Sequence, residues 1–174
     1  ENFRINDLTE DFVRRGHQVT VLTGVPNYPT GKADAGYSEN SSKYNEYRGA
    51  DVVRVPMLVR GKGNIQLFLN YFSFALMAST LGIYKLRKQV FDIVFVFEPS
   101  PITVGLPAVL LSRLKQSPLI FWVLDLWPDT LQAIGVVRSE FILKAVGLLV
   151  SLIYKRCDLI LGQSKDFLPQ IQSY

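Results

Sequence analysis

Apolar runs alternate with segments of helical spacing along the second half of the chain. Residues 91–101, 117–129 and 158–164 each contain a continuous run of Val, Ile, Leu or Phe, and helix-like segments separate them. Continuous apolar runs are typical of strands that are buried on both faces. Their alternation with helices predicts an α/β fold with a parallel sheet and helices on both faces of that sheet.

The first half begins with a helical pattern rather than a strand. Residues 4–15 place apolar residues on one helical face, and Gly16 is a natural stop. Residues 18–24 and 51–58 are predicted strands. Because a strand normally precedes such a helix in a parallel fold, we expect the first strand to lie upstream and to be missing from this chain.

Residues 25–49 are rich in Pro, Gly, Ser, Asn and Tyr, which predicts a long irregular loop of the kind that often carries function. A basic turn, "RGKG", follows at residues 60–63. Arg60 and Lys62 are candidates for a phosphate or membrane contact, with the glycines letting the backbone approach. A merely exposed basic turn explains them equally well.

Two strongly apolar helices are predicted at residues 64–88 and 141–157. The first is long enough to resemble a membrane span, but interrupting polar residues favour a core helix that is partly exposed to lipid. Both helices have basic borders, which suits contact with a membrane surface, although two ordinary covering helices remain an alternative. These border residues are Lys85, Arg87, Lys88, Lys144, Lys155 and Arg156.

Composition narrows the function classes. The chain has 174 residues, of which 48% are hydrophobic, and this predicts a single domain over residues 1–174. Its net charge of +4 is spread without long basic runs, so no nucleic-acid partner is expected. One Cys excludes an internal disulfide, and one Cys with one His leaves too few ligands for a zinc site.

Neither a Walker A loop nor a G-x-G-x-x-G motif occurs, and no cofactor is expected. No signal peptide is visible, and the missing initiating Met suggests part of a longer protein.

Parallel sheets bind ligands at the carboxyl ends of their strands. Gly24, Glu98, Asp125 and Gln163 all follow or end predicted strands, so we expect them at one edge of the sheet. His17 precedes a strand and is expected at the opposite edge, which argues against a Ser-His-Asp triad.

Acidic residues are the leading candidates at this edge. Asp125 and Glu98 form a pair that could divide acid and base roles, or they could cap helices instead. Asp129 is predicted to cap a short helix. Three roles stay open for Trp127, which are stacking on a sugar, lying at a membrane interface and plain packing.

Several segments resemble the N-terminal domain of family-4 glycosyltransferases with the GT-B fold. They are "RRGHQVTVLTGVPNYPTGK", "RGKG", "FDIVFVFEPSPITVGLPA", "WVLDLWPDTLQAIGV" and "IYKRCDLILGQSKDF". "PNYPTGK" together with "DLWPDTL" is the most specific part. The nearest likeness is to bacterial enzymes of colanic-acid, capsule and O-antigen assembly, including the fucosamine transferase type.

The resemblance implies one Rossmann-like half of a GT-B enzyme, the half that holds the acceptor. A C-terminal domain, absent here, would bind the nucleotide-sugar donor, so the fragment alone is expected to be inactive. It also implies transfer with retention, no bound metal and a lipid-linked saccharide acceptor. By motif, Asp125 is the candidate catalytic residue, and the candidate acceptor or sugar contacts are Asn27, Tyr28, Lys32, Glu98, Ser100, Trp127, Gln163 and Ser164.

The leading hypothesis is therefore the acceptor half of a hexosyltransferase type enzyme, peripheral on the cytoplasmic face of the membrane. Two alternatives stay open. One is a stand-alone Rossmann-like nucleotide-binding domain, and the other is a membrane-association module. The lack of a glycine fingerprint counts against the first.

Overall fold

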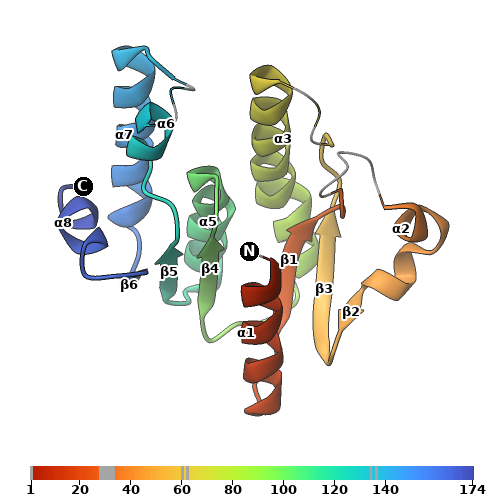
Figure 1. Ribbon diagram of the computed structural model, residues 1–174. Helices are drawn as coiled ribbons and strands as arrows, with labels where there is room; N and C mark the ends of the chain where they lie inside the picture. Colours follow the sequence, from red (N-terminus) through yellow and green to blue (C-terminus); the bar gives the residue numbers. More distant parts are fainter. Residues whose placement is uncertain (1, 28–33, 60, 62, 134, 136) are drawn as a thin grey trace. The chain divides into compact units, whose positions relative to one another are not determined.

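A computed structural model describes residues 2–27, 34–59, 61, 63–133, 135 and 137–174 (Figure 1). The chain divides into two compact units, Glu1–Lys88 and Gln89–Tyr174. Each unit has its own three-stranded sheet, ordered β1-β3-β2 in the first unit and β4-β5-β6 in the second. Both strand pairs of the second sheet are parallel, and the first sheet has one parallel and one antiparallel pair, which confirms the predicted α/β class.

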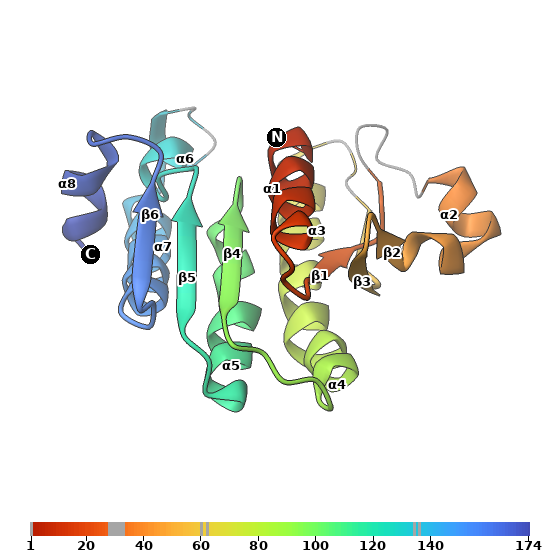
Figure 2. The same cartoon turned by 90° about the horizontal axis from the view of Figure 1, so that it is seen from below.

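In the first unit, β1 (Thr20–Gly24) pairs in parallel with β3 (Ala50–Val55). The helix α1 (Asn2–Arg14) lies on one side of this pair, and it ends before Gly16, whose φ of 89° suits glycine. A second long helix, over residues 64–86, lies on the other side of the pair (Figure 2). The predicted helix and the two predicted strands are confirmed, with the strands shorter than expected.

The prediction of an irregular loop over residues 25–49 is wrong for residues 35–47. This stretch contains α2 (Ala35–Glu39), the 3₁₀ turn η1 (Ser41–Tyr44) and β2 (Glu46–Tyr47). Asp34 caps α2, since its Oδ1 accepts a hydrogen bond from Tyr37 N at 3.0 Å. The two residues of β2 pair antiparallel with β3. A strand this short depends on its neighbour, so local sequence could not reveal it.

The helix predicted at residues 64–88 is continuous. It comprises α3 (Asn64–Met77), the π-helical turn η2 (Ala78–Gly82) and α4 (Ile83–Leu86). Its second half packs on the sheet, because a Cβ added at Gly82 would lie 3.1 Å from Leu22 Cδ1 and 3.5 Å from Val55 Cγ1. The second half of this helix therefore covers the sheet, as the polar interruptions suggested.

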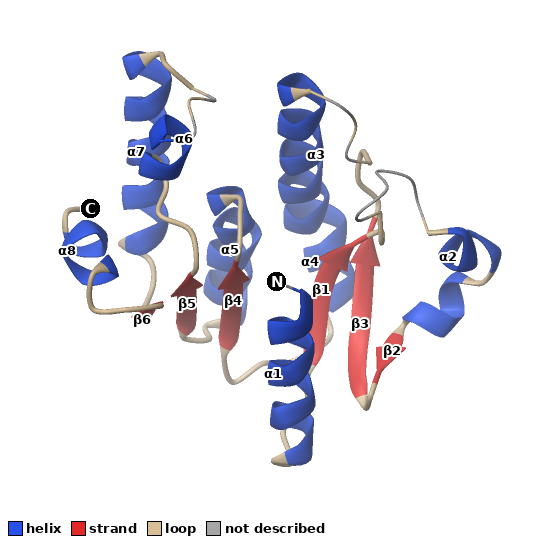
Figure 3. Ribbon diagram, in the orientation of Figure 1, coloured by secondary structure: helices blue, strands red, loops and turns tan. Residues whose placement is uncertain are grey.

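In the second unit, β4 (Val94–Glu98), β5 (Leu119–Val123) and β6 (Leu159–Gly162) are all parallel. The connecting elements are η3 (Ile102–Val104), α5 (Gly105–Lys115), α6 (Asp129–Ala133) and α7 (Glu140–Tyr154), and α8 (Phe167–Gln172) follows the last strand (Figure 3). Alternate residues of β4 and β5 are buried, and Phe121 of β5 meets Tyr154 of α7 edge to face at 5.9 Å. The core of this unit therefore lies between the sheet and α7.

Gly105 marks the tightest approach of α5 to that core. A Cβ there would lie 2.7 Å from Ile153 Cγ2 and 3.0 Å from Phe121 Cε2. We expect Gly105→Ala to lower the free energy of unfolding by about 1–3 kcal/mol, because the buried neighbours must shift. Urea denaturation measures this.

Gly147 of α7 supplies the matched control, since its Cβ would meet only Tyr174, at 3.5 Å. Gly147→Ala should leave stability unchanged or raise it by up to about 1 kcal/mol, because alanine favours helix. Equal effects of the two substitutions would contradict the packing account.

Candidate functional site

The carboxyl ends of β4, β5 and β6 meet at one edge of the second unit. Leu124, directly after β5, donates its N–H to Glu98 O at 3.1 Å. The Gln163 side chain, directly after β6, donates from Nε2 to Leu124 O at 2.9 Å. Glu98, the Leu124–Asp125 step and Gln163 are thereby held together, as the parallel-strand argument predicted.

Glu98 is the last residue of β4, and its side chain has no exposed surface. It lies on the buried side of the strand, in register with Val123 of β5. Its Oε2 accepts a long hydrogen bond from Asp125 N at 3.4 Å, and its Oε1 has no partner among the described residues. Burial, with a contribution from the Asp125 charge, raises the pKa of Glu98 to about 8. At neutral pH the Glu98 carboxyl therefore carries its proton.

Asp125 is held by two donors from its own loop. Its Oδ1 accepts from Thr130 Oγ1 at 2.5 Å, and its Oδ2 accepts from Trp127 Nε1 at 3.1 Å. Thr130 lies in α6, so the start of this helix fixes the carboxylate from one side and the indole from the other. Each carboxylate oxygen keeps a further lone pair. The group is thus both oriented and able to accept one more hydrogen bond.

The structure corrects two expectations for the loop that follows β5. The Trp127 indole N–H is used to position Asp125, a role that was not among the three considered. Asp129 is the first residue of α6 and not the cap before it, so the capping prediction is wrong by one position. Its charge still lies in the first turn, where the helix dipole favours an acid.

The remaining predicted residues of the second unit lie near the edge with fewer contacts. Ser100 follows β4 with a φ of 148° and precedes a cis bond to Pro101. Ser164 is exposed, and its carbonyl accepts from Phe167 N at 3.2 Å. Within the described part of this unit, neither serine hydroxyl bonds to Glu98 or Asp125.

In the first unit, Asn27 follows β1, and its Nδ2 donates to Val25 O at 2.9 Å. His17 precedes β1, at the amino end of the strand as predicted, and contacts the Phe12 ring edge to face at 6.0 Å. The other predicted residues, Tyr28, Lys32, Arg60 and Lys62, lie outside the described residues.

An apolar face is exposed on α3. The ring of Phe68 stacks on that of Phe72 at 6.1 Å, and the two side chains are 65% and 54% exposed. Ile65 at 77% and Leu76 at 50% extend the same face along the helix. By length and composition alone, the helix Asn64–Leu86 could cross a membrane. In the second unit, α7 also exposes Phe141 and Leu148.

Sequence reasoning missed Thr130 and Arg54. Thr130 lies in the first turn of the helix that follows Asp125, and the short spacing between the two residues was a usable signal. Arg54 is a charged residue in an apolar strand beside its carboxyl end, and that position could have marked it. Within the described ranges, no group of three or more His, Cys, Asp or Glu side chains is arranged to hold a metal ion.

Comparison with known families adds one finding. A family model described as "Glycosyl transferase 4-like domain" matches residues 2–172, nearly the whole chain. No curated protein sequence matches the chain significantly.

Proposed function

Since the chain belongs to the glycosyl transferase 4-like family and is the N-terminal domain of a GT-B glycosyltransferase, we propose that it holds the acceptor in a retaining sugar transfer. The donor is a nucleotide sugar bound by a second domain, and the transferred group is a hexosyl residue. The acceptor is a lipid-linked saccharide of bacterial surface polysaccharide synthesis, of the colanic-acid, capsule or O-antigen kind.

The oriented carboxylate of Asp125 is the observation that carries this proposal. Glycosyl transfer needs a group that aligns the acceptor hydroxyl and tolerates positive charge at the anomeric carbon. Asp125 stands at the ligand-binding edge of a parallel sheet, with both oxygens anchored and lone pairs to spare. Its proposed role is to accept a hydrogen bond from the acceptor hydroxyl and to stabilise the developing charge.

Glu98 supports this role as a neutral neighbour. A second ionised carboxylate beside Asp125 would repel it, whereas a protonated Glu98 does not. Two carboxyl groups whose surroundings separate their protonation states can serve distinct tasks. Glu98 thus lets Asp125 face the acceptor as the single charge of the pair.

The direct test is sugar transfer by a form of the protein that carries a donor-binding domain. A panel of nucleotide sugars is offered with a polyprenyl-diphosphate-linked saccharide, and the product is identified by mass spectrometry. We expect one extra hexosyl unit on the acceptor, and NMR of the product should show the donor's anomeric configuration. Absence of transfer with every donor contradicts the proposal, and an inverted product contradicts retention.

The acceptor's lipid requires the enzyme to work at a membrane surface, and we assign this contact to the exposed face of α3 on the cytoplasmic side. Burying one Phe side chain contributes about 1.5–3 kcal/mol. We therefore expect Phe68→Ser with Phe72→Ser to weaken binding to phosphatidylglycerol-containing vesicles at least about tenfold in sedimentation assays.

Val90→Ser is the matched control, because Val90 is 89% exposed but lies outside α3. This variant should sediment with vesicles as the wild type does. Equal binding by the α3 double variant and the wild type would contradict the assignment to α3. A wild type that stays in the supernatant would contradict membrane contact itself.

A further inference from the structure

Arg54 lies in β3 beside the carboxyl end of the sheet of the first unit, in register with Thr23 of β1. Its guanidinium is partly buried. Nη1 donates to Gly24 O at 2.9 Å, and Nε donates to Tyr44 O at 3.3 Å. Both partners are neutral carbonyl groups. The Nη2 amino group has no hydrogen-bond partner within the described residues.

Two tyrosine rings, in edge-to-face contact with each other at 5.5 Å, lie together on one side of the guanidinium. Its central carbon lies 5.8 Å from the ring centroid of Tyr37 and 6.0 Å from that of Tyr44. The Tyr44 hydroxyl donates to Asp34 Oδ1 at 2.9 Å, so the acid next to the rings is engaged with tyrosine rather than with arginine. Cation–π contacts of this kind hold a guanidinium in place while leaving its edge donors available.

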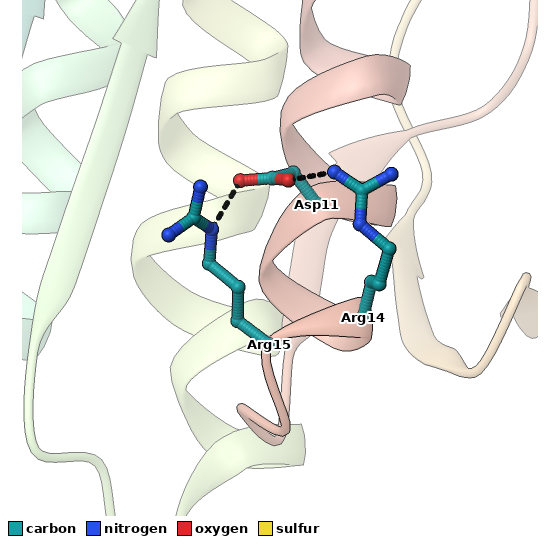
Figure 4. Close-up of polar contacts among 3 residues, drawn as sticks. All are labelled: Asp11, Arg14 and Arg15. Atoms are coloured by element: carbon teal, nitrogen blue, oxygen red, sulfur yellow. Dashed lines mark hydrogen bonds and ion pairs between the residues drawn. The ribbon is translucent and has the colours of Figure 1, made fainter.

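No carboxylate in the described part of the chain pairs with Arg54, whereas other arginines of this unit have acid partners. Asp11 pairs with both Arg14 and Arg15, the latter at 2.6 Å (Figure 4), and Arg48 pairs with Glu10 at 3.1 Å. The only acidic residue outside the described ranges is Glu1.

Partial burial disfavours the charged form of Arg54 and lowers its pKa, yet a guanidinium stays charged in proteins. The lack of an acidic partner is therefore costly in free energy. A partly buried charge without a protein counter-ion is unfavourable unless an anion is bound.

We infer that Arg54 is the centre of an oxyanion site, walled by Tyr37 and Tyr44, that takes the phosphate group of a ligand. The planar fork of a guanidinium fits two phosphate oxygens, and the Nη2 donors are the ones left to meet them. This site rests on the first unit alone. Its failure would leave the sugar-transfer proposal intact, because that proposal rests on Asp125.

The test is a titration of the 174-residue chain with inorganic pyrophosphate and, separately, with soluble dihexanoyl phosphatidic acid, at matched ionic strength. Calorimetry gives the affinity, and the Arg54 Nε–H signal in ¹H–¹⁵N NMR reports contact at the site. We expect saturable binding of at least one probe, with a shift of that signal. The probe that binds tells a free phosphate compound from a lipid headgroup.

Arg54→Met should weaken this binding at least about tenfold, because the charge and both donors are lost. Arg54→Lys should recover only part of it, since an ammonium cannot bind bidentately. Arg14→Met removes the same charge from an exposed site, 79% accessible, and should bind as the wild type. No saturable binding to the wild type, or equal binding by Arg54→Met and Arg14→Met, overturns the inference. If Arg54→Met does not fold, the wild-type Nε–H signal decides.

Discussion

Replacing Asp125 by Asn should reduce the rate of sugar transfer by about 10²–10⁴-fold, the range expected when a positioned catalytic group is removed. Asn can keep the loop in place, because its oxygen can accept from Trp127 Nε1 and its amide can donate to Thr130 Oγ1, the two groups that now donate to Asp125. The substitution therefore removes the charge with little change of shape. The loss should appear in kcat rather than in KM for the acceptor.

Thr130→Val is the matched variant for this experiment. It removes one anchor of Asp125 but keeps the carboxylate, so it should cost about tenfold or less. An enzyme whose rate is unchanged in Asp125→Asn would show that Asp125 has no catalytic role. Equal losses in both variants would show that loop geometry, not charge, is what the reaction needs.

The second large effect is on stability, which should fall as pH rises from about 4.5 to about 8. In the unfolded chain Glu98 has its ordinary pKa near 4.5, but in the folded state burial raises that pKa to about 8. Between these values the folded protein keeps a proton that the unfolded chain has lost. The unfolded state binds fewer protons, so the free energy of unfolding decreases, by at most about 1.4 kcal/mol per pH unit.

Glu98→Gln keeps the shape and removes the titration. Urea denaturation across this pH range should show a flatter profile for the variant, and above pH 8 the variant should be the more stable protein. Glu140→Gln makes the same change at an exposed position in the first turn of α7 and should keep the wild-type slope. A wild-type slope no steeper than that of Glu98→Gln would contradict a buried, protonated Glu98.

Much of the fold followed from periodicity. Apolar runs and helical spacing predicted the main helices and strands of the second unit, which are β4, α5, β5, α7 and β6, because such patterns reflect which face an element buries. Order along the chain then placed Glu98, Asp125 and Gln163 at one edge, since parallel strands end together. The elements between Asp34 and Tyr47 were not predicted, because this polar, glycine-containing segment folds against β3 rather than by its own propensity.

What the sequence determined by itself is the α/β class, the main strands and helices, and the edge at which its carboxylates stand, because these depend on local patterns and on chain direction. What only the tertiary structure decided is the chemical state of those residues. Packing against the sheet buries Glu98 and leaves it protonated. The folded loop brings Thr130 and Trp127 onto Asp125, and two tyrosine rings pack on one side of Arg54. Burial and hydrogen bonding join residues that are distant or unremarkable in sequence, and protonation and charge follow from those contacts.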